Sequence, residues 1–349
     1  MIQKEEQPKV LSILVPVYNT EKYIRRCLDS ILIKEIVDDV EVIVVSDGSK
    51  DSSVKIVREY VDRFPDTIHL IEKENGGHGS TINKGIEVAR GKYFRVLDSD
   101  DWFNILDLIP FVEKLKQTDA DLVLTDYAHE FIYEQKCEAH RYKKIKPGTV
   151  YFLDKVDREM IDGDYFMMAT STYKTEVLRK SGLHLLEKTF YVDMQYDIEP
   201  VANIDSFVYY DFDIYRYYIG RPDQSVSLSS MVRRKHDHEK VVRHLVEFYE
   251  DSKPQLSENK LTYIRMVMAY LLHTHYMIFC AYDPDKKNAG IEIRKFDAYL
   301  KGISTDIYSD TNKDSYIYAQ RKSNFRYIGR LSRVFNVIVA GIRFVKGKN

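Results

Sequence analysis

Three carboxylates gather in the segment VLDSDDWF, which runs from Val96 to Phe103. They are Asp98, Asp100 and Asp101, and they follow YFRVL, an apolar segment typical of a buried strand. Like charges this close raise one another's pKa unless a cation relieves them. A hard divalent metal such as Mg²⁺ or Mn²⁺ prefers oxygen ligands and often bridges to phosphate. The segment therefore predicts either a metal site or a helix N-terminus, where Asp100 and Asp101 would interact with the helix dipole.

Polar segments also follow three other expected strands. They are PVYN at 16–19, SDGS at 46–49 and NGGHG at 75–79. Any one of them alone is ordinary turn chemistry. In open α/β sheets, however, ligands bind at the carboxyl ends of the strands. Four such segments in register along one edge therefore predict a ligand site there.

The elements that must position these segments alternate between strand and helix. Strands are expected at 10–18, 40–47, 68–73, 93–97 and 120–131, and helices at 20–31, 52–64, 81–90 and 105–117. Thr20 is expected to cap the first helix. Alternation with short connections predicts an α/β fold with a mostly parallel central sheet and helices on both faces.

The pattern changes after about residue 130. Strands and turns are expected first, then a helix in VDMQYDIEPVANI and a pair of tyrosine-rich strands in DSFVYYDFDIYRYYI. Helices dominate from about 228 onward, with one apolar face in 236–250 and another in 259–282. A helical C-terminal region is therefore expected after the α/β part.

The last segment, 321–349, carries eight lysines and arginines and no acid. Apolar residues lie between these cations in the pattern of a basic amphipathic helix, which can lie on an anionic membrane surface. The alternative is a helix that packs on the protein and keeps its basic face in solvent. The sequence leaves both open.

Composition narrows the classes of function. The 349 residues exceed one ordinary domain, and a net charge of −2 argues against a nucleic-acid binder. Three cysteines without a CxxC spacing argue against a disulfide framework and fit a reducing compartment. The polar N-terminus shows no signal-peptide pattern, and no apolar run reaches the roughly 18 residues of a membrane span.

The segments SILVPVYNTEKYIRRCLDSIL, VIVVSDGSKDSS and NGGHGSTINKGIEVARGKYFRVLDSDDWF resemble family 2 glycosyltransferases with the GT-A fold. The resemblance is close from residue 10 to about 105 and looser to about 230. It implies inverting, metal-dependent transfer from a nucleotide-diphosphate sugar, of the UDP-sugar type, to a glycan or lipid-linked acceptor. We then expect a GT-A catalytic domain over 1–227 (donor half 10–105, acceptor half 106–227), a helical region over 228–320 and the basic tail over 321–349.

The resemblance also implies roles for single residues on the donor side. Asp47 matches the aspartate that hydrogen-bonds a uracil-type base. Asp98 and Asp100 match the DXD pair that holds Mn²⁺ or Mg²⁺; Asp98 also lies near the ribose, and Asp100 is the expected ligand of the metal on the diphosphate. Asp101 would extend this cluster toward the donor sugar, unless it is a helix cap. The other expected donor-binding residues are Pro16, Val17, Tyr18, Asn75 and Gly76.

On the acceptor side, Asp193 in YVDMQY matches the aspartate of the family's ED motif, the general base. The acceptor hydroxyl must lose its proton, a task for one carboxylate on the far side of the sugar. Without the resemblance, Asp193 is equally an ordinary salt bridge or helix cap. A loop near the diphosphate or acceptor is matched by Arg221, Gln224 and Ser225.

Three positions depart from the family pattern and leave donor selection open. Ser46 stands where a second aspartate often precedes DGS, Ile82 precedes Asn83 where an Arg-Asn pair is common, and Val192 replaces the glutamate of the ED pair. The metal ligands and the base are all retained.

Other candidate residues carry less weight. His78 could approach the donor, and Trp102 is interpreted as a packing anchor. The histidine pairs at 236/238 and 273/275 are two residues apart in helical patterns, so their side chains diverge and metal binding is not expected.

Two other functions stay open. A nucleotidyltransferase would show a glycine-rich loop with a basic residue near its N-terminus, which PVYNTEKYIRR is not. A glycan- or membrane-binding pseudoenzyme is disfavoured because Asp98, Asp100 and Asp193 are all retained. For the enzyme, we expect a role in cell-envelope polysaccharide synthesis, a cytoplasmic location with contact to the inner face of the plasma membrane, and no nucleic-acid partner.

Overall fold

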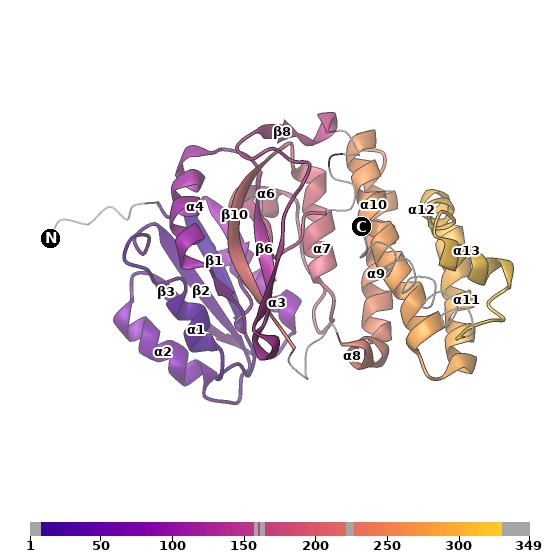
Figure 1. Cartoon of the computed structure of the whole chain (residues 1–349), viewed down its shortest axis with the longest axis horizontal. Helices are drawn as coiled ribbons and strands as arrows, with labels where there is room; N and C mark the ends of the chain where they lie inside the picture. Colours follow the sequence, from indigo (N-terminus) through magenta and orange to yellow (C-terminus); the bar gives the residue numbers. More distant parts are fainter. Residues whose placement is uncertain (1–7, 157–159, 161–164, 221–226, 330–349) are drawn as a thin grey trace. The chain divides into compact units, whose positions relative to one another are not determined.

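The computed structural model describes residues 8–156, 160, 165–220 and 227–329. The chain divides into two compact units, Met1–Arg221 and Pro222–Asn349. The first unit is α/β and the second is helical (Figure 1). The predicted fold class is thereby confirmed, whereas the limits of the donor half, the acceptor half and the basic tail stay predictions.

The elements of the first unit follow the expected alternation as far as β6. They are β1 (Leu11–Val17), α1 (Ile24–Asp29), β2 (Val40–Asp47), α2 (Ser53–Arg63), β3 (Ile68–Lys73), α3 (His78–Val88), β4 (Tyr93–Val96), β5 (Trp102–Phe103), α4 (Ile105–Gln117), β6 (Leu122–Phe131), β7 (Lys136–His140), β8 (Val150–Phe152), β9 (Ser171–Lys174), α6 (Thr175–Lys180), α7 (Asp193–Ile198) and β10 (Ser206–Ile219).

These strands form one mixed sheet in the order β3-β2-β1-β4-β9-β6-β10-β5, with β7 paired to β6 and β8 to β10. β1 is parallel to β2 and β4, β2 to β3, and β10 to β6. β9 is antiparallel to both β4 and β6, so those two strands run in the same direction. The carboxyl ends of β1, β2, β3, β4, β6 and β10 therefore share one edge of the sheet.

Helices cover both faces of the sheet (Figure 1). On one face, Leu11, Ile13 and Val15 of β1 join a core with residues of α1, α2 and α4. On the other face lies α3, where Gly85 allows close approach: a Cβ there would stand 2.7 Å from a Leu14 methyl. A site at the carboxyl edge can therefore receive side chains from both layers.

The sequence placed two helix starts wrongly. Thr20 does not cap α1, because that helix begins at Ile24 and its N-cap residue is Tyr23. Instead the Thr20 amide donates to Ser53 Oγ at 2.9 Å. α3 begins at His78, earlier than expected, so part of the glycine-rich segment is helical. This earlier start puts His78 in the first turn of a helix at the sheet edge.

The expected pair of tyrosine-rich strands is one continuous strand, β10, of 14 residues. Its register against β6 shifts on both sides of Asp213. The Asp213 amide donates to Asp107 Oδ2 at 3.0 Å instead of to a neighbouring strand. A local irregularity has replaced the predicted turn because a bulge adds a residue without reversing the chain.

One charged side chain lies at the centre of the sheet, where the sequence suggested only an apolar strand. Arg95 of β4 is fully buried. It donates to the hydroxyls of Thr172 and Thr125 at 2.8 and 3.1 Å and to the Ala169 carbonyl. Burial lowers the pKa of Arg95 to about 10. Its bonds fix β4 to β9 and β6 because a buried guanidinium must be satisfied by its neighbours.

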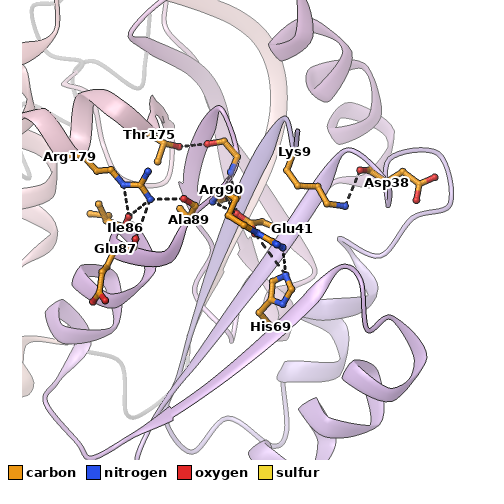
Figure 2. Close-up of polar contacts among 12 residues, drawn as sticks. Lys9, Asp38, Glu41, His69, Ile86, Glu87, Ala89, Arg90, Thr175 and Arg179 are labelled. Atoms are coloured by element: carbon orange, nitrogen blue, oxygen red, sulfur yellow. Dashed lines mark hydrogen bonds and ion pairs between the residues drawn. The ribbon is translucent and has the colours of Figure 1, made fainter. Parts of the chain in front are cut away.

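A second buried charge holds the connection from α3 to β4 (Figure 2). Glu41 of β2 accepts from Ser12 Oγ at 2.5 Å and from the Arg90 side chain and backbone. Arg179 of α6 donates to the carbonyls of Ile86 and Ala89 on the same connection. Burial alone would raise the pKa of Glu41, but the bonds from Ser12 and Arg90 outweigh it and the pKa is lowered.

The second unit is helical. Its elements are α8 (Leu228–Arg233), α9 (Lys235–Ser252), α10 (Glu258–Met277), a π-helical turn (Ile278–Tyr282), α11 (Lys286–Ile303), α12 (Thr305–Thr311) and α13 (Ser315–Lys322). His238 and His275 are buried and stack at 5.3 Å between ring centroids, whereas His236 is exposed and His273 contacts Asp314. The expected divergence within each histidine pair is confirmed.

No helix within the described ranges is both long and apolar enough to cross a membrane. The basic tail does not begin as one continuous helix, because α13 ends at Lys322 and turns follow to Gly329. Arg321 pairs with Asp297 at 2.7 Å, and Phe325 is buried. These first tail residues therefore pack on the helical unit; residues 330–349 lie outside the described residues, and membrane contact stays a prediction.

Replacing Glu41 with Gln should lower the free energy of unfolding by about 2 kcal/mol or more, because charge-assisted bonds to Arg90 and Ser12 are lost. Since the folded pKa is lowered, this stabilisation is present above the unfolded value of about 4.3 and is lost as pH falls through the folded value. Denaturant unfolding at pH 7 and at pH 3 to 4 measures it. The difference between wild type and Glu41→Gln should shrink at the lower pH.

The control is Glu87→Gln, because the Glu87 side chain is 67% exposed and its carboxylate pairs with Lys84 in a surface ion pair. Its unfolding midpoint should match wild type. Equal midpoints for both variants would contradict the assigned role of Glu41.

Candidate active site

The glycine-rich loop at the carboxyl edge is organised by Asp47. The Asp47 carboxylate accepts from the amides of Gly76 and Gly77, each at 2.8 Å, and from Lys73 Nζ at 2.9 Å. Asn75 Nδ2 donates to the Asp47 carbonyl at 2.9 Å. Asp47 is 3% exposed, so this structure gives it the role of shaping the loop. Its expected contact with a nucleobase stays a prediction.

Gly77 ends the loop in a conformation that favours glycine, with φ of +84°. The turn at Gly77 starts α3 immediately, and His78 is its first residue. The shape of the loop thus sets the position of the His78 imidazole.

His78 contacts one of the carboxylates that the sequence singled out. Its Nε2 lies 3.0 Å from Asp98 Oδ1, and both side chains are about one third exposed, at 34% and 31%. Burial opposes a charge on His78, but Asp98 and, more weakly, Asp193 and Asp100 outweigh it, so the pKa of His78 is raised. The sequence had named His78 only as a residue that could approach the donor.

Asp193 is the first residue of α7. Burial raises the pKa of Asp193, while the charge of His78 lowers it and that of Asp98 raises it further. The structure therefore brings Asp193 near enough to Asp98 of the DXD pair for their charges to interact, although Asp193 lies 93 positions after Asp100. Val192 is buried beside it and contributes no second carboxylate.

A buried carboxylate lies one helical turn beyond Asp193. Asp197 is 3% exposed, and burial, then the charge of Asp193, raises its pKa well above the ordinary range. Residues four apart share a helix face, so Asp197 lies behind Asp193. The spacing of the two aspartates was visible in DMQYD, but burial of the second was not.

Asp101 turns away from the other carboxylates. It is fully buried, and it accepts from the Tyr215 hydroxyl at 2.7 Å and from the Tyr218 amide at 2.8 Å. The helix-cap alternative is wrong, because Asn104 caps α4 through the Leu106 amide. This geometry gives Asp101 a structural role, in which it bonds the DSDD segment to β10. The geometry does not support a contact of Asp101 with the donor sugar.

Arg26 of α1 is the cation next to this segment, and sequence reasoning missed it. It donates to the Asp100 carbonyl at 2.8 Å, and its guanidinium lies 3.7 Å from the centre of the Trp102 ring. Burial lowers the pKa of Arg26, and the charge of Asp101 opposes that shift. Trp102 thus packs against Arg26, in line with its interpretation as an anchor.

The predicted nucleobase loop differs along its length in exposure. Pro16 and Val17 are buried within β1, whereas Tyr18 is 51% exposed. Asn19 follows with φ of +54°, and its Oδ1 accepts from the Lys50 amide at 2.8 Å. Tyr18 is therefore the member of this loop whose side chain is available to a ligand.

Asp98 and Asp100 suit a divalent metal of the Mg²⁺ or Mn²⁺ class. Both are partly exposed carboxylates at the sheet edge, and oxygen ligands are those that such hard cations prefer. With Asp101 turned into the core, Asp98 and Asp100 are the two carboxylates of this segment that would hold such a cation. Arg221, Gln224 and Ser225, the other expected contacts, lie outside the described residues.

Comparisons with known proteins bear on the family and the fold of the chain. Residues 12–180 match the family model described as Glycosyl transferase family 2. EpsH of Bacillus subtilis is 44% identical over 161 residues, 42% of this chain and 45% of EpsH. The glycosyltransferase GlyA of Streptococcus pneumoniae is 37% identical over 117 residues, 34% of this chain and 16% of GlyA. The chain thus spans less than half the length of these curated relatives.

Solved structures of S. aureus TarS share the fold. TarS in complex with UDP-GlcNAc has a TM-score of 0.68 at 17% identity, covering 93% of this chain and 91% of that chain. TarS in complex with UDP has a TM-score of 0.62 at 17% identity, with the same coverage. At this identity the likeness shows the fold alone, which is of the GT-A type. The family match covers just under half of the chain, and it assigns residues 12–180 to glycosyl transferase family 2.

Proposed function

We propose that the protein transfers a sugar, with inversion, from a UDP-sugar to a glycan or lipid-linked acceptor. The observation that carries this proposal is the contact of His78 with Asp98, together with the influence of the Asp193 charge on His78. This supports the proposal because α/β folds bind ligands at the carboxyl edge of the sheet, where the expected metal ligand Asp98 lies.

Asp193 is the general base of the proposed reaction. A carboxylate is most effective as a base when its pKa is raised toward the operating pH, and burial raises the pKa of Asp193. Asp197 behind it is buried, and burial raises its pKa well above the ordinary range, which disfavours its charged form. Asp193 is then the group of α7 that accepts the proton of the acceptor hydroxyl.

Asp98 and Asp100 hold the divalent metal, Mn²⁺ or Mg²⁺, which neutralises charge on the leaving diphosphate when bound. His78 keeps the Asp98 carboxylate oriented through its 3.0 Å contact. Asp47 shapes the loop of Asn75 and Gly76, whose position beside the edge suits the donor. The choice of UDP follows from the family resemblance and from TarS, which was solved with UDP-GlcNAc.

The acceptor and the location belong to the same proposal. A cell-envelope polysaccharide or its lipid carrier, at the cytoplasmic face of the plasma membrane, would suit the family and the basic residues of 321–349. The choice of a polysaccharide as the acceptor rests on these two arguments and on no residue of the site.

Asp193→Asn should reduce the rate of UDP release from the UDP-sugar that wild type uses by about 10²- to 10⁴-fold, the usual contribution of a general base. A panel of UDP-hexoses and UDP-N-acetylhexosamines, each with Mn²⁺, identifies that sugar. UDP affinity, measured by calorimetry, should stay within about twofold of wild type, because the base does not hold the nucleotide.

The matched control is Asp237→Asn, which also removes an acid from the first turn of a helix. It should leave the rate unchanged. An Asp193→Asn enzyme as fast as wild type would refute the base assignment.

Asp100→Asn should weaken UDP binding in Mn²⁺ by at least about tenfold, or 1.4 kcal/mol. The physical reason is the loss of an anionic ligand to the metal that bridges to the diphosphate. Calorimetric titration of UDP with and without Mn²⁺ measures this loss of affinity. The control is Asp119→Asn, because the Asp119 side chain is 78% exposed. Identical Mn²⁺ dependence in Asp100→Asn and wild type would rule Asp100 out as a ligand.

A further inference from the structure

The hairpin of β6 and β7 carries a cluster that the proposed reaction does not use. His129 lies directly opposite Glu138 across the two strands, and His140 lies two residues beyond Glu138. Side chains two apart on a strand share a face, so all three project from the same side of the hairpin. Within the described residues, they form the group of three whose ligand atoms all lie within 4.8 Å of one another.

The two imidazoles meet through their ring nitrogens. His140 Nε2 lies 3.0 Å from His129 Nδ1. In a metal-free pair, one nitrogen must carry the proton that it donates to the other. If His140 instead carries its proton on Nδ1, both facing nitrogens offer lone pairs to a cation.

Aromatic side chains hold both rings in place. Tyr127 stacks on His140 with 4.7 Å between centroids and 10° between planes. Phe131 and Tyr217 flank His129, with centroids at 6.0 and 5.6 Å. Packed neighbours of this kind limit the reorientation that a ligand site would otherwise require.

We propose that His129, Glu138 and His140 bind a divalent cation of the zinc class, at a site separate from the one at Asp98 and Asp100. Two imidazole nitrogens and a carboxylate oxygen form a common zinc ligand set. Zinc–nitrogen bonds of about 2.0 to 2.1 Å in a tetrahedron put the two nitrogens roughly 3.3 to 3.4 Å apart, close to the observed separation. Three protein ligands leave a fourth position for water or another ligand.

The ligand types separate the two sites chemically. Imidazole binds Zn²⁺ more strongly than Mn²⁺, in keeping with the general order of divalent affinities, whereas carboxylates alone suit Mg²⁺ and Mn²⁺. Burial and then His140 lower the pKa of His129, which favours the neutral imidazole that binds metal. Lys136 pairs with Glu138 and is the group that a cation must displace.

The proposed zinc site adjoins the candidate active site through β10. Tyr217, which flanks His129, pairs with it in the parallel register of β6 and β10. The neighbouring Tyr215 and Tyr218 of the same strand bond Asp101. A cation bound to the hairpin would therefore stabilise the position of β10, the strand to which the DSDD segment is bonded.

Calorimetric titration of Zn²⁺ into the chelator-treated full chain tests the proposal. We expect one zinc per chain in wild type and in Asp100→Asn, where the other metal site is damaged. His140→Ala and Glu138→Gln should each weaken this binding by more than about tenfold, since even loss of a residue that only supports a ligand costs 10- to 100-fold. His184→Ala, which removes an exposed histidine elsewhere, should bind like wild type.

His140→Ala and Glu138→Gln change residues of the surface hairpin. Unchanged circular dichroism and UDP affinity would show that both variants fold. Addition of Mn²⁺ should not displace the zinc from wild type. Absence of stoichiometric zinc binding in wild type, or binding that survives both His140→Ala and Glu138→Gln, would overturn the proposal and leave a hydrogen-bonded histidine pair. Loss of zinc binding in Asp100→Asn alone would likewise refute it by assigning the zinc to the carboxylate pair.

Discussion

The buried carboxylate of Asp101 is the constraint on which the site depends. It accepts from the Tyr215 hydroxyl and the Tyr218 amide, and Tyr215 in turn accepts from the Asp98 amide at 3.3 Å. Burial, with the charges of Asp100 and Asp98, raises the pKa of Asp101 well above its ordinary range. The DSDD segment is thereby attached to β10, and its two remaining carboxylates are directed to the sheet edge.

The local charge at that edge is balanced from both layers of the fold. Arg26 comes from α1, on one face of the sheet, and His78 from α3, on the other. A cluster of carboxylates is costly unless cations lie nearby, since each charge raises the energy of the next. The protein thus provides part of the neutralisation itself, and a divalent metal with the donor would provide the rest.

Local patterns predicted most elements of the first unit. The strands β1 to β4 and the helix α4 follow from apolar periodicity and polar ends, which depend on neighbours in sequence. The continuity of the single strand β10 did not follow from such local patterns, because it depends on pairing with β6, β8 and β5. Arg95 was likewise unexpected, since its three hydrogen-bond partners lie on segments distant in sequence.

The sequence by itself determined the α/β class, the polar edge and the candidates Asp98, Asp100 and Asp193, because these follow from local patterns and from family resemblance. Only the tertiary structure decided that His78 contacts Asp98, that Asp101 is turned into the core, and that His129, Glu138 and His140 converge. The physical reason is that strand pairing and burial set these contacts, and both depend on segments that the chain brings together only when it folds.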